Sequence, residues 1–417
     1  MSPVGRSLQT VCFIIGSLLI GGSGWIAYTT IDRASVQAEQ PAPEMAAMGS
    51  SEGRVFDSDM SFPELATYFQ DLAREEGGEH AFAVMINSEL PSNIDTHLLG
   101  HVIGDMLYEQ EGLAGMSLCT HDFRNACSHS IVIGALLEHG VSVFDDINDI
   151  CRQAPGDSGL SYNMCFHGFG HGVLAYTDYD LEAAVALCER TGTAEHHYYE
   201  FNECFGGVIM EIHAGIHDRE TWQRNAVQYL DAEDPANLCE HSFIPDRVRD
   251  ICYVYLTPFI FDLFTAGEFP TDEHIAQSFS YCDGIADTRN RHACYGGIGK
   301  ELPGLLQGRD VSRIGQLTPV QLRQIEQRCA LATTEAGYDV CNEYVLTSLY
   351  WGGENPHTFP AQYCGLVTSG DRQLSCYRNL HDVYAYYLPD DHASHRQRYC
   401  DSYQDEVRAD CYEYFSL

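Results

Sequence analysis

The hydrophobic positions after residue 60 recur with the spacing of amphipathic helices. The segment FPELATYFQDLAREEG at 62–77 places apolar residues three and four positions apart, which puts them on one buried face of a helix. Alternating apolar and polar runs joined by Asn-Gly turns, the pattern of β-hairpins, do not occur in the sequence. The pattern therefore predicts an all-α fold whose ordered part begins near Phe62.

One apolar run near the N-terminus departs from this pattern. Residues 9–28, QTVCFIIGSLLIGGSGWIAY, carry no charge over about 20 positions, which is long enough for a transmembrane helix. We predict an uncleaved signal anchor at 9–28, with residues 1–8 in the cytoplasm and a linker at 29–61. A cleaved signal peptide is the alternative. Either reading places the bulk outside the cytoplasm, and the anchor predicts a single-pass inner-membrane protein, periplasmic or extracellular.

The cysteines fall in pairs along the rest of the chain. Of 17 cysteines, Cys12 lies in the apolar run and sixteen remain. An even number downstream of an export signal is typical of disulfides, whereas the CxxC pairs of zinc knuckles are absent from the sequence. Sequence alone does not fix connectivity, but the regular spacing favours bonds between nearest neighbours. The predicted disulfides are Cys119–Cys127, Cys151–Cys165, Cys188–Cys204, Cys239–Cys252, Cys282–Cys294, Cys329–Cys341, Cys364–Cys376 and Cys400–Cys411.

The second cysteine of each pair stands in a recurrent local pattern. An aromatic residue and then small residues often follow it, as in CFHGFGHG, CFGGVIME and CYGGIGKE. An acidic residue and an arginine precede it, as in PDRVRDIC and DTRNRHAC, and such an acidic residue is a helix N-cap signal. Each unit therefore predicts a helix ending near the first cysteine, a loop, and a helix opening near the second. Such hairpins, which repeat about every 35–50 residues, predict an α/α solenoid.

This arrangement resembles the disulfide-stapled helical repeat proteins of the Sel1-like kind, at the level of architecture, over roughly residues 115–417. The resemblance implies an exported α/α solenoid. The HGFGHG run at 167–172 is similar to uncharacterised bacterial and archaeal exported proteins, and that similarity implies no mechanism. We divide the ordered chain into His-rich helical repeats at 62–220 and Cys-paired helical repeats at 221–417.

Histidines are concentrated in the first of these two parts. Three pairs are spaced i,i+4, namely His97/His101, His167/His171 and His213/His217, so each pair shares a helix face. Such a pair can give two imidazoles to one metal ion. Counted from the second cysteine of successive repeats, one common face carries His129, His167, His171, Met210, His213 and His217. The predicted metal ligands are His97, His101, His129, His167, His171 and His213.

The ligand type leaves several cofactors open. Imidazole suits Cu, Fe and Zn ions, and paired histidines can also hold haem b by axial ligation. Asp105 and Glu211 lie off the histidine faces and are not expected as metal ligands. Glu109 is instead expected to hydrogen-bond to a ligand histidine and orient its ring. The glycines Gly168, Gly170 and Gly172 have a separate explanation, because they let neighbouring helices pack closely.

Charge and missing motifs narrow the function. A formal net charge of −37 repels nucleic acid, and no nucleotide-binding or serine-hydrolase motif indicates an enzyme class. The sequence thus predicts a membrane-anchored extracytoplasmic protein with a multi-histidine metal or haem site on a helical scaffold. The alternative is a metal-free scaffold whose surface binds another envelope protein or a glycan.

Overall fold

A computed structural model describes residues 53–91, 94–154, 159–193, 197–215, 217, 219–265, 269–351, 355–367, 370–387 and 393–417. Within these ranges the chain forms α-helices and short 3-10 helices and no β-strand, which confirms the all-α prediction. The apolar run at 9–28 and most of the predicted linker lie outside the described residues.

The helices are mostly short and follow one another closely. In the first half they are α2 (Phe62–Glu76), α3 (Gly78–Ile86), α4 (Thr96–Glu111), α5 (Asp122–His139), α6 (Ile147–Cys151), α7 (Gly159–Tyr176), α8 (Leu181–Cys188), α9 (His197–Ala214) and α10 (Arg219–Asn225). In the second half they are α11 (Asn237–Glu240), α12 (Arg249–Tyr255), α13 (Thr257–Thr265), α14 (Asp272–Asp283), α15 (Thr288–Leu306), α16 (Pro319–Cys329), α17 (Glu335–Tyr350), α18 (Thr358–Cys364), α19 (Gly370–Tyr387), α20 (Ala393–Asp401) and α21 (Asp405–Phe415).

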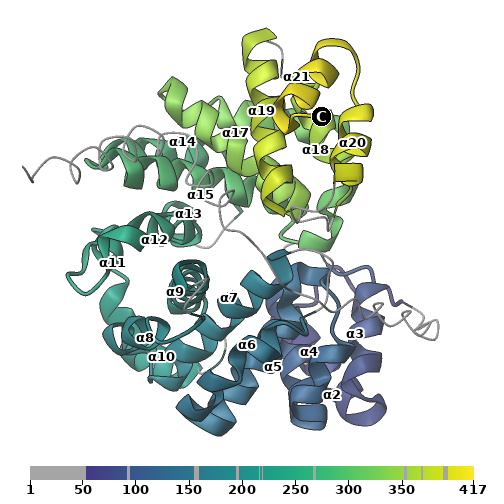
Figure 1. Ribbon diagram of the computed structural model, residues 1–417. Coiled ribbons are helices and arrows are strands. Elements are labelled where there is room, and N and C mark those ends of the chain that lie inside the picture. The colour runs from purple at the N-terminus through teal and green to yellow at the C-terminus, as the bar shows by residue number, and fades with distance from the viewer. Residues whose placement is uncertain are drawn as a thin grey trace, which may run out of the picture.

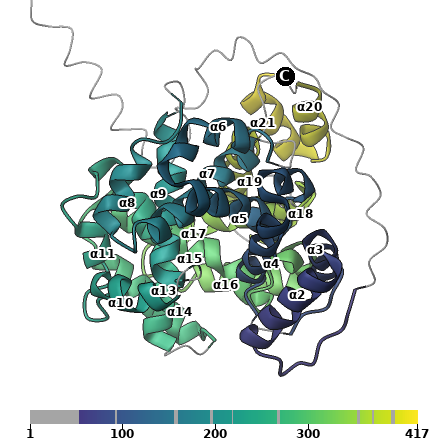
Figure 2. The ribbon, with the colours of Figure 1, turned by 90° about the horizontal axis from the view of Figure 1, so that it is seen from below.

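The helices that carry the second cysteine of each pair form, together with α4, a continuous curved stack. Helices α4, α5, α7, α9, α12, α15, α17, α19 and α21 each pack against the next (Figure 1). The stack curves so far that an early helix contacts a late one. Arg124 of α5 donates a 2.8 Å hydrogen bond to Ser348 of α17. The Val311 amide, in the 3-10 helix Val311–Gln316 between α15 and α16, likewise donates to Thr96 at the start of α4, and this 3-10 helix contacts both α4 and α5 (α4, α15 and α16 are labelled in Figure 2).

Eight disulfides hold the hairpins together. Each disulfide joins a cysteine to the next cysteine along the chain, and the two Cα atoms lie 5.3–5.7 Å apart. The first cysteine lies at the end of a short helix in seven of the eight, and the second lies within a following long helix. The structure therefore has the nearest-neighbour pairing that the spacing favours.

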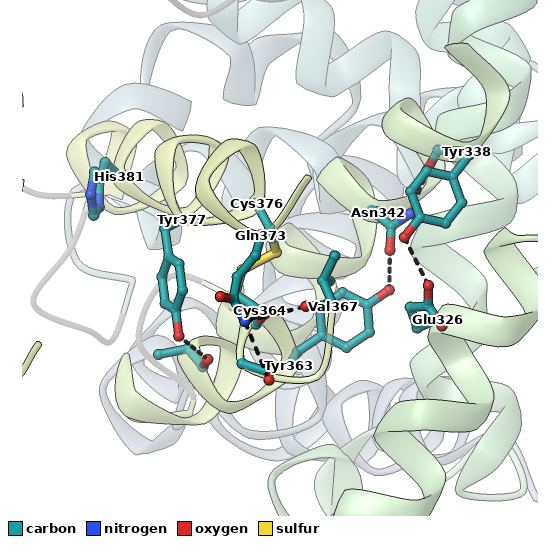
Figure 3. The surroundings of a disulfide bond; sticks show 12 residues. Glu326, Tyr338, Asn342, Tyr363, Cys364, Val367, Gln373, Cys376, Tyr377 and His381 are labelled. Atoms are coloured by element: carbon teal, nitrogen blue, oxygen red, sulfur yellow. Dashed lines mark hydrogen bonds between the residues drawn. A yellow bond between two sulfur atoms is a disulfide. The ribbon is translucent and has the colours of Figure 1, made fainter. Parts of the chain in front are cut away.

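In several hairpins the residue three positions before the second cysteine bonds to carbonyls at the end of the preceding helix. Arg249 donates to the carbonyl of Cys239, and Arg408 donates to the carbonyl of Asp401, the last residue of α20, and to that of Tyr403 just after it. Gln373 occupies the same place beside the disulfide of α18 and α19 and donates to the Cys364 carbonyl (Figure 3). The last carbonyls of a helix have no partner within it, so these side chains explain the recurrent arginine.

The long helices begin earlier than the sequence pattern indicated. Helix α15 starts at Thr288, whereas the second cysteine of its unit, Cys294, lies well inside it. Asp287 caps the helix by accepting a hydrogen bond from the Asn290 amide, as an aspartate N-cap does. The acidic residue before the cysteine was therefore a correct helix-start signal, and the expectation that the helix opens near the cysteine itself was wrong.

One described stretch is long and apolar enough to cross a membrane by length and composition. It is Asp122–Asp145, which comprises α5 and the short 3-10 helix after it. This stretch packs between α4 and α7, and most of its side chains are buried, as in the core helix of a folded domain. It carries His129, so the core helix of the first half is also a helix of the histidine cluster described below.

Glycines bring α5, α7 and α9 into backbone contact. A Cβ atom added to Gly170 of α7 would lie 1.9 Å from the carbonyl oxygen of Cys204 in α9. A Cβ on Gly168 would lie 2.5 Å from the Cα of His129 in α5. Since real Cβ atoms do not approach other atoms this closely, only glycine allows these helix separations. This close packing is the separate explanation that the sequence offered for the glycines.

Replacing Gly170 tests this packing. We expect Gly170→Ala to lower the free energy of unfolding by about 3 kcal/mol, because the new methyl group would displace the α9 backbone. Gly304→Ala in α15 is the matched control, since its Cβ would meet only one atom, at 4.0 Å. There the higher helix propensity of alanine should raise stability by up to about 1 kcal/mol. Urea unfolding followed by circular dichroism measures both, and equal effects would show that the helices are not in contact at Gly170.

Candidate metal centre

Six imidazole rings meet where α4, α5, α7 and the segment after α9 pack together. Neighbouring rings in this group have centroids 4.8–6.1 Å apart. The rings belong to His97 and His101 of α4, His129 of α5, His167 and His171 of α7, and His217 after α9. We call these six residues the histidine cluster. Five of them are residues that the sequence predicted as metal ligands.

The histidine cluster is buried and largely uncharged. His101 and His171 have no exposed surface, and the other four side chains are at most 6% exposed. Burial lowers the pKa of His97 to about 3, and burial with neighbouring imidazoles lowers the pKa of His101 and His129 well below the usual value. These rings are therefore neutral at physiological pH, which is the state that binds metal ions.

His97, His101 and His129 form a set whose ligand atoms all lie within 4.8 Å of one another. The Nδ1 atom of His97 donates to the Phe123 carbonyl at 2.7 Å, so its Nε2 atom carries the lone pair. That Nε2 atom lies 3.3 Å from Nε2 of His101. Two nitrogens held at about 2.0–2.1 Å by one tetrahedral ion are separated by about 3.3 Å, which matches this spacing.

The Phe123 carbonyl owes its position to an unusual turn at the start of α5. Phe123, Arg124 and Asn125 all have left-handed backbone angles, with φ of 54°, 55° and 64°. Such angles cost of order 1–3 kcal/mol per non-glycine residue and are retained only where the surroundings enforce them. Here Arg124 is held by Ser348 and by the ring of Trp351, 4.2 Å away. Helix α17 and Trp351 after it thus support the turn that orients His97.

Several ring nitrogens of the histidine cluster have no hydrogen-bond partner. They are both nitrogens of His129 and the Nε2 atoms of His171 and His217, and all four are buried. An unsatisfied buried polar group costs about 1–3 kcal/mol, so native proteins rarely retain several together. Metal coordination would satisfy one nitrogen on each of these three rings.

Glu211 of α9 orients the second set of rings. Its carboxylate accepts hydrogen bonds from Nδ1 of His171 at 3.0 Å, Nδ1 of His217 at 2.9 Å and the Tyr179 hydroxyl at 2.7 Å. A carboxylate bonded to one imidazole nitrogen fixes the tautomer and makes the other nitrogen a better metal ligand. His171, Glu211 and His217 are also close enough to hold an ion directly, with ligand atoms within 4.8 Å.

Glu211 and His217 are a charged pair in the protein without metal. Burial favours a neutral Glu211, but the charge of His217 and the hydrogen bonds from both histidines outweigh it and hold the pKa below its usual range. Burial likewise disfavours protonated His217, but the carboxylates of Glu211 and Asp105 raise its pKa to about 9. Asp105, half-buried on α4, therefore contributes through its charge.

Three expectations from the sequence need correction. His213 does not join the cluster, because its ring packs on Phe259 and its Nε2 lies 3.2 Å from Asp262. The residues of α9 that face α7 and the cluster are Gly207 and Glu211. Counted from the second cysteine of their own helix, they stand one position later than His167 and His171 do on α7. Glu211 is thus part of the site. Glu109, expected to support the ligands, is exposed.

His217 was placed on the common face but not among the predicted ligands, and the end of α9 explains how it reaches the cluster in place of His213. The helix stops at Ala214, and Gly215 has a positive φ of 58° that turns the chain back. His217 therefore folds onto Glu211 instead of continuing along the helix face of His213. Sequence contained the signal in the HAGIH segment, where a glycine follows His213 and can terminate the helix.

The cluster meets other polar residues at His167. The centroid of the Tyr255 ring lies 5.1 Å from that of the His167 ring. The Nζ atom of Lys300 on α15 lies 4.8 Å from the centroid of the Tyr255 ring. Glu203 has a carboxylate oxygen 3.9 Å from His167, and burial raises the pKa of Glu203 to about 8. The side chains of Glu203 and Lys300 are partly exposed, so this is the side on which the cluster approaches solvent.

A separate surface cleft of about 880 Å³ lies between α11, α12, α14 and α15. Arg249, Tyr253 and Tyr281 are among its lining residues, and no residue of the histidine cluster lines it. Arg249 and Tyr253 already bond to other residues of the hairpin. The cleft is therefore a groove between neighbouring hairpins, and the convergent chemistry lies in the histidine cluster.

Comparisons with known proteins add no relative. No protein-family model matches this sequence, and searches of curated proteins and of solved structures give no match either. The resemblance to Sel1-like repeats therefore stays a prediction, and the functional argument depends on the geometry of the cluster.

Proposed function

We propose that this protein binds transition-metal ions in the histidine cluster. The observation that carries the proposal is the group of four buried ring nitrogens of His129, His171 and His217 that have no hydrogen-bond partner. The 3.3 Å approach of the His97 and His101 Nε2 atoms and the carboxylate behind His171 and His217 support it. In this proposal the N-terminal run anchors the chain to the inner membrane, and a solenoid of stapled hairpins holds the centre outside the cytoplasm.

The ligand set favours free ions over haem. Most neighbouring ring centroids lie 4.8–5.6 Å apart, which fits rings bound to one tetrahedral ion better than axial ligands on opposite sides of a haem iron. All described cysteines are bonded in disulfides, so imidazole and carboxylate are the ligands on offer. Cu, Fe and Zn ions all accept such ligands, and among divalent ions copper binds most strongly in the general order of affinity. Storage, delivery and redox use of the ion are all compatible with this set.

Metal analysis of the full chain tests the proposal. The protein is produced by export, extracted in mild detergent without a polyhistidine tag, and analysed for Cu, Fe and Zn and for its absorption spectrum. We expect bound metal in the wild type and a loss of at least ten-fold in affinity in His101→Ala/His171→Ala, which removes one ring from each set.

The matched control is His121→Ala/His139→Ala, which removes two exposed histidines at the ends of α5. This control should keep the metal content of the wild type. Metal content that is unchanged in the cluster variant would contradict the proposal. So would a wild-type protein that stays metal-free after incubation with each of the three ions, and a partner captured by such an apo protein would instead favour a metal-free scaffold.

A further inference from the structure

Five of the six rings of the histidine cluster fall into two sets, with His167 beside them, and we infer that the centre holds two metal ions, one in each set. This inference rests on the proposed metal binding and extends it. The first set is His97, His101 and His129, and the second contains His171 and His217 with Glu211. Each set takes histidine from a HxxxH segment, on α4 or α7, and completes it with a histidine from a neighbouring segment.

The contacts of His97 separate the first set from the second, although His101 lies 5.4 Å from both His171 and His217. In the first set all three pairs of rings are in contact, with centroids 4.8, 5.4 and 5.3 Å apart. Rings bound to one ion have centroids about 5 Å apart, so these three fit a single ion. Among the described rings, the contacts of His97 are with His101 and His129 and with no ring of the second set. One ion in the first set therefore cannot also use His217.

The second set has its own unsatisfied ligands. Glu211 takes the Nδ1 protons of both His171 and His217, which leaves two buried Nε2 atoms without partners. The rings of these histidines lie 5.9 Å apart, and each lies 5.4 Å from His101. An ion in the first set would satisfy His97 and His101 and leave the Nε2 atom of His217 unpaired. A second ion removes that deficit by replacing the proton that charged His217 carries on Nε2, and this proton is released to the solvent.

His129 lies between the two sets. Its ring contacts His97 and His101 at 5.4 and 5.3 Å and the α7 rings of His167 and His171 at 5.6 and 6.1 Å. Both of its ring nitrogens are buried without a partner, although one ion needs only one of them. An imidazole placed in this way binds one ion through each nitrogen when it loses its ring proton to the solvent, and through one nitrogen when it keeps it.

The charges around the second set suit an additional cation. Two divalent ions in a buried site repel each other unless anionic groups lie nearby. Glu211 is fully buried beside His171 and His217, and Asp105 acts on His217 from α4. Glu211 bonds the Nδ1 atoms of His171 and His217, so it supplies negative charge behind the rings of the second set and is not a ligand of an ion at their Nε2 atoms. Pairs of ions in such centres bind one small oxygen-donor ligand together, such as hydroxide or a carboxylate.

Equilibrium dialysis of the full chain in detergent against Cu²⁺, followed by elemental analysis, tests the inference. We expect two equivalents in the wild type, and one equivalent in each of His97→Ala and His217→Ala, which remove ligands from different sets. His139→Ala is the control and should retain two. Circular dichroism shows whether each variant is folded. Electron paramagnetic resonance gives a readout that needs no variant, because two adjacent Cu²⁺ ions couple magnetically and a single ion does not.

The outcomes separate this inference from the proposed function. Two equivalents with a coupled signal, falling to one with an isolated signal in each variant, support the two-ion centre. One equivalent with an isolated signal in the wild type overturns the two-ion centre and leaves metal binding intact. No bound copper, zinc or iron overturns both. Two equivalents that persist in both His97→Ala and His217→Ala place the ions outside these sets and also overturn the inference.

Discussion

Complete reduction of the eight disulfides is expected to unfold the described part of the chain at room temperature. Each disulfide closes a loop between cysteines that are 8–16 residues apart. In the chain-entropy model a loop of this size stabilises the folded state by about 3 kcal/mol. Folded domains have a net stability of only about 5–15 kcal/mol, so the loss of all eight exceeds what the remaining contacts supply. The short helices α6, α8 and α11 depend most on their disulfides, because isolated helices of so few residues are unstable.

The measurement is far-ultraviolet circular dichroism during incubation with a phosphine reductant, with free thiols counted after quenching. The control is the same protein without reductant, which should retain its helical signal. Most of the cysteines are fully buried, so reduction should be slow and should proceed together with unfolding. A chain with all sixteen of these cysteines reduced that keeps the melting temperature of the oxidised protein would contradict the expectation.

The helices and their pairing could be predicted because their signals are local. Each hairpin carries a cysteine near the end of one helix, a second cysteine in the next, and a residue such as Arg249 that stabilises the first helix. These features recur within a short stretch and need no knowledge of distant residues. Helix lengths were less well predicted, because N-caps such as Asp287 set the start of a helix and the cysteine does not.

The closure of the curved stack could not be predicted in this way. The hydrogen bond between Arg124 and Ser348 joins residues 224 positions apart, and neither residue stands in a distinctive motif. The left-handed turn at Phe123, Arg124 and Asn125 was also hidden, since none of the three is glycine. Tertiary contacts impose this turn, and the turn in turn orients His97.

The residues of the candidate site also differ in whether local sequence signals could predict them. His97, His101, His167 and His171 are spaced i,i+4 within regular helices, so a shared face was enough to bring them together. His217 lies beyond the end of α9, where the face of a helix no longer predicts direction. Glu211 was discounted for its angle on the helix, yet the neighbouring helix α7 meets α9 on the side where Glu211 projects. Contacts between helices decided these cases.

The glycines and histidines of the HGFGHG segment have linked roles. Gly168 lets α7 approach His129 of α5, and Gly207 of α9 lies against the His167 carbonyl. These close backbone contacts bring the imidazoles of adjacent helices near enough to bind the same metal ion. Packing and metal binding are therefore complementary explanations of the segment, and neither replaces the other.

Glu211→Gln is expected to lower the free energy of unfolding of the metal-free protein by about 3–5 kcal/mol. This is the usual cost of breaking a buried charge pair, because the remaining imidazolium of His217 loses its counter-charge. Glutamine has nearly the same shape, so packing changes little. With metal present the same change should also weaken binding by about 10–100-fold, since Glu211 orients the ring nitrogens of His171 and His217. Glu109→Gln on the exposed face of α4 is the control and should alter stability by less than about 0.5 kcal/mol.

The pH dependence of this cost identifies its origin. His217 has a raised pKa of about 9 against an ordinary value of 6.5, so its share is complete below pH 6.5 and disappears as the pH rises through about 9. Glu211 has a lowered pKa against an ordinary 4.5, so its share is complete above pH 4.5 and disappears as the pH falls through that lower value. His101, His171 and Asp105 also face the pair, and only Asp105 adds a compensating negative charge. Urea unfolding in chelator from pH 4 to 10 should therefore show the largest difference between wild type and variant at about pH 4.5–6.5. A difference that stays constant to pH 10 would mean that packing, and not charge, is what Glu211 contributes.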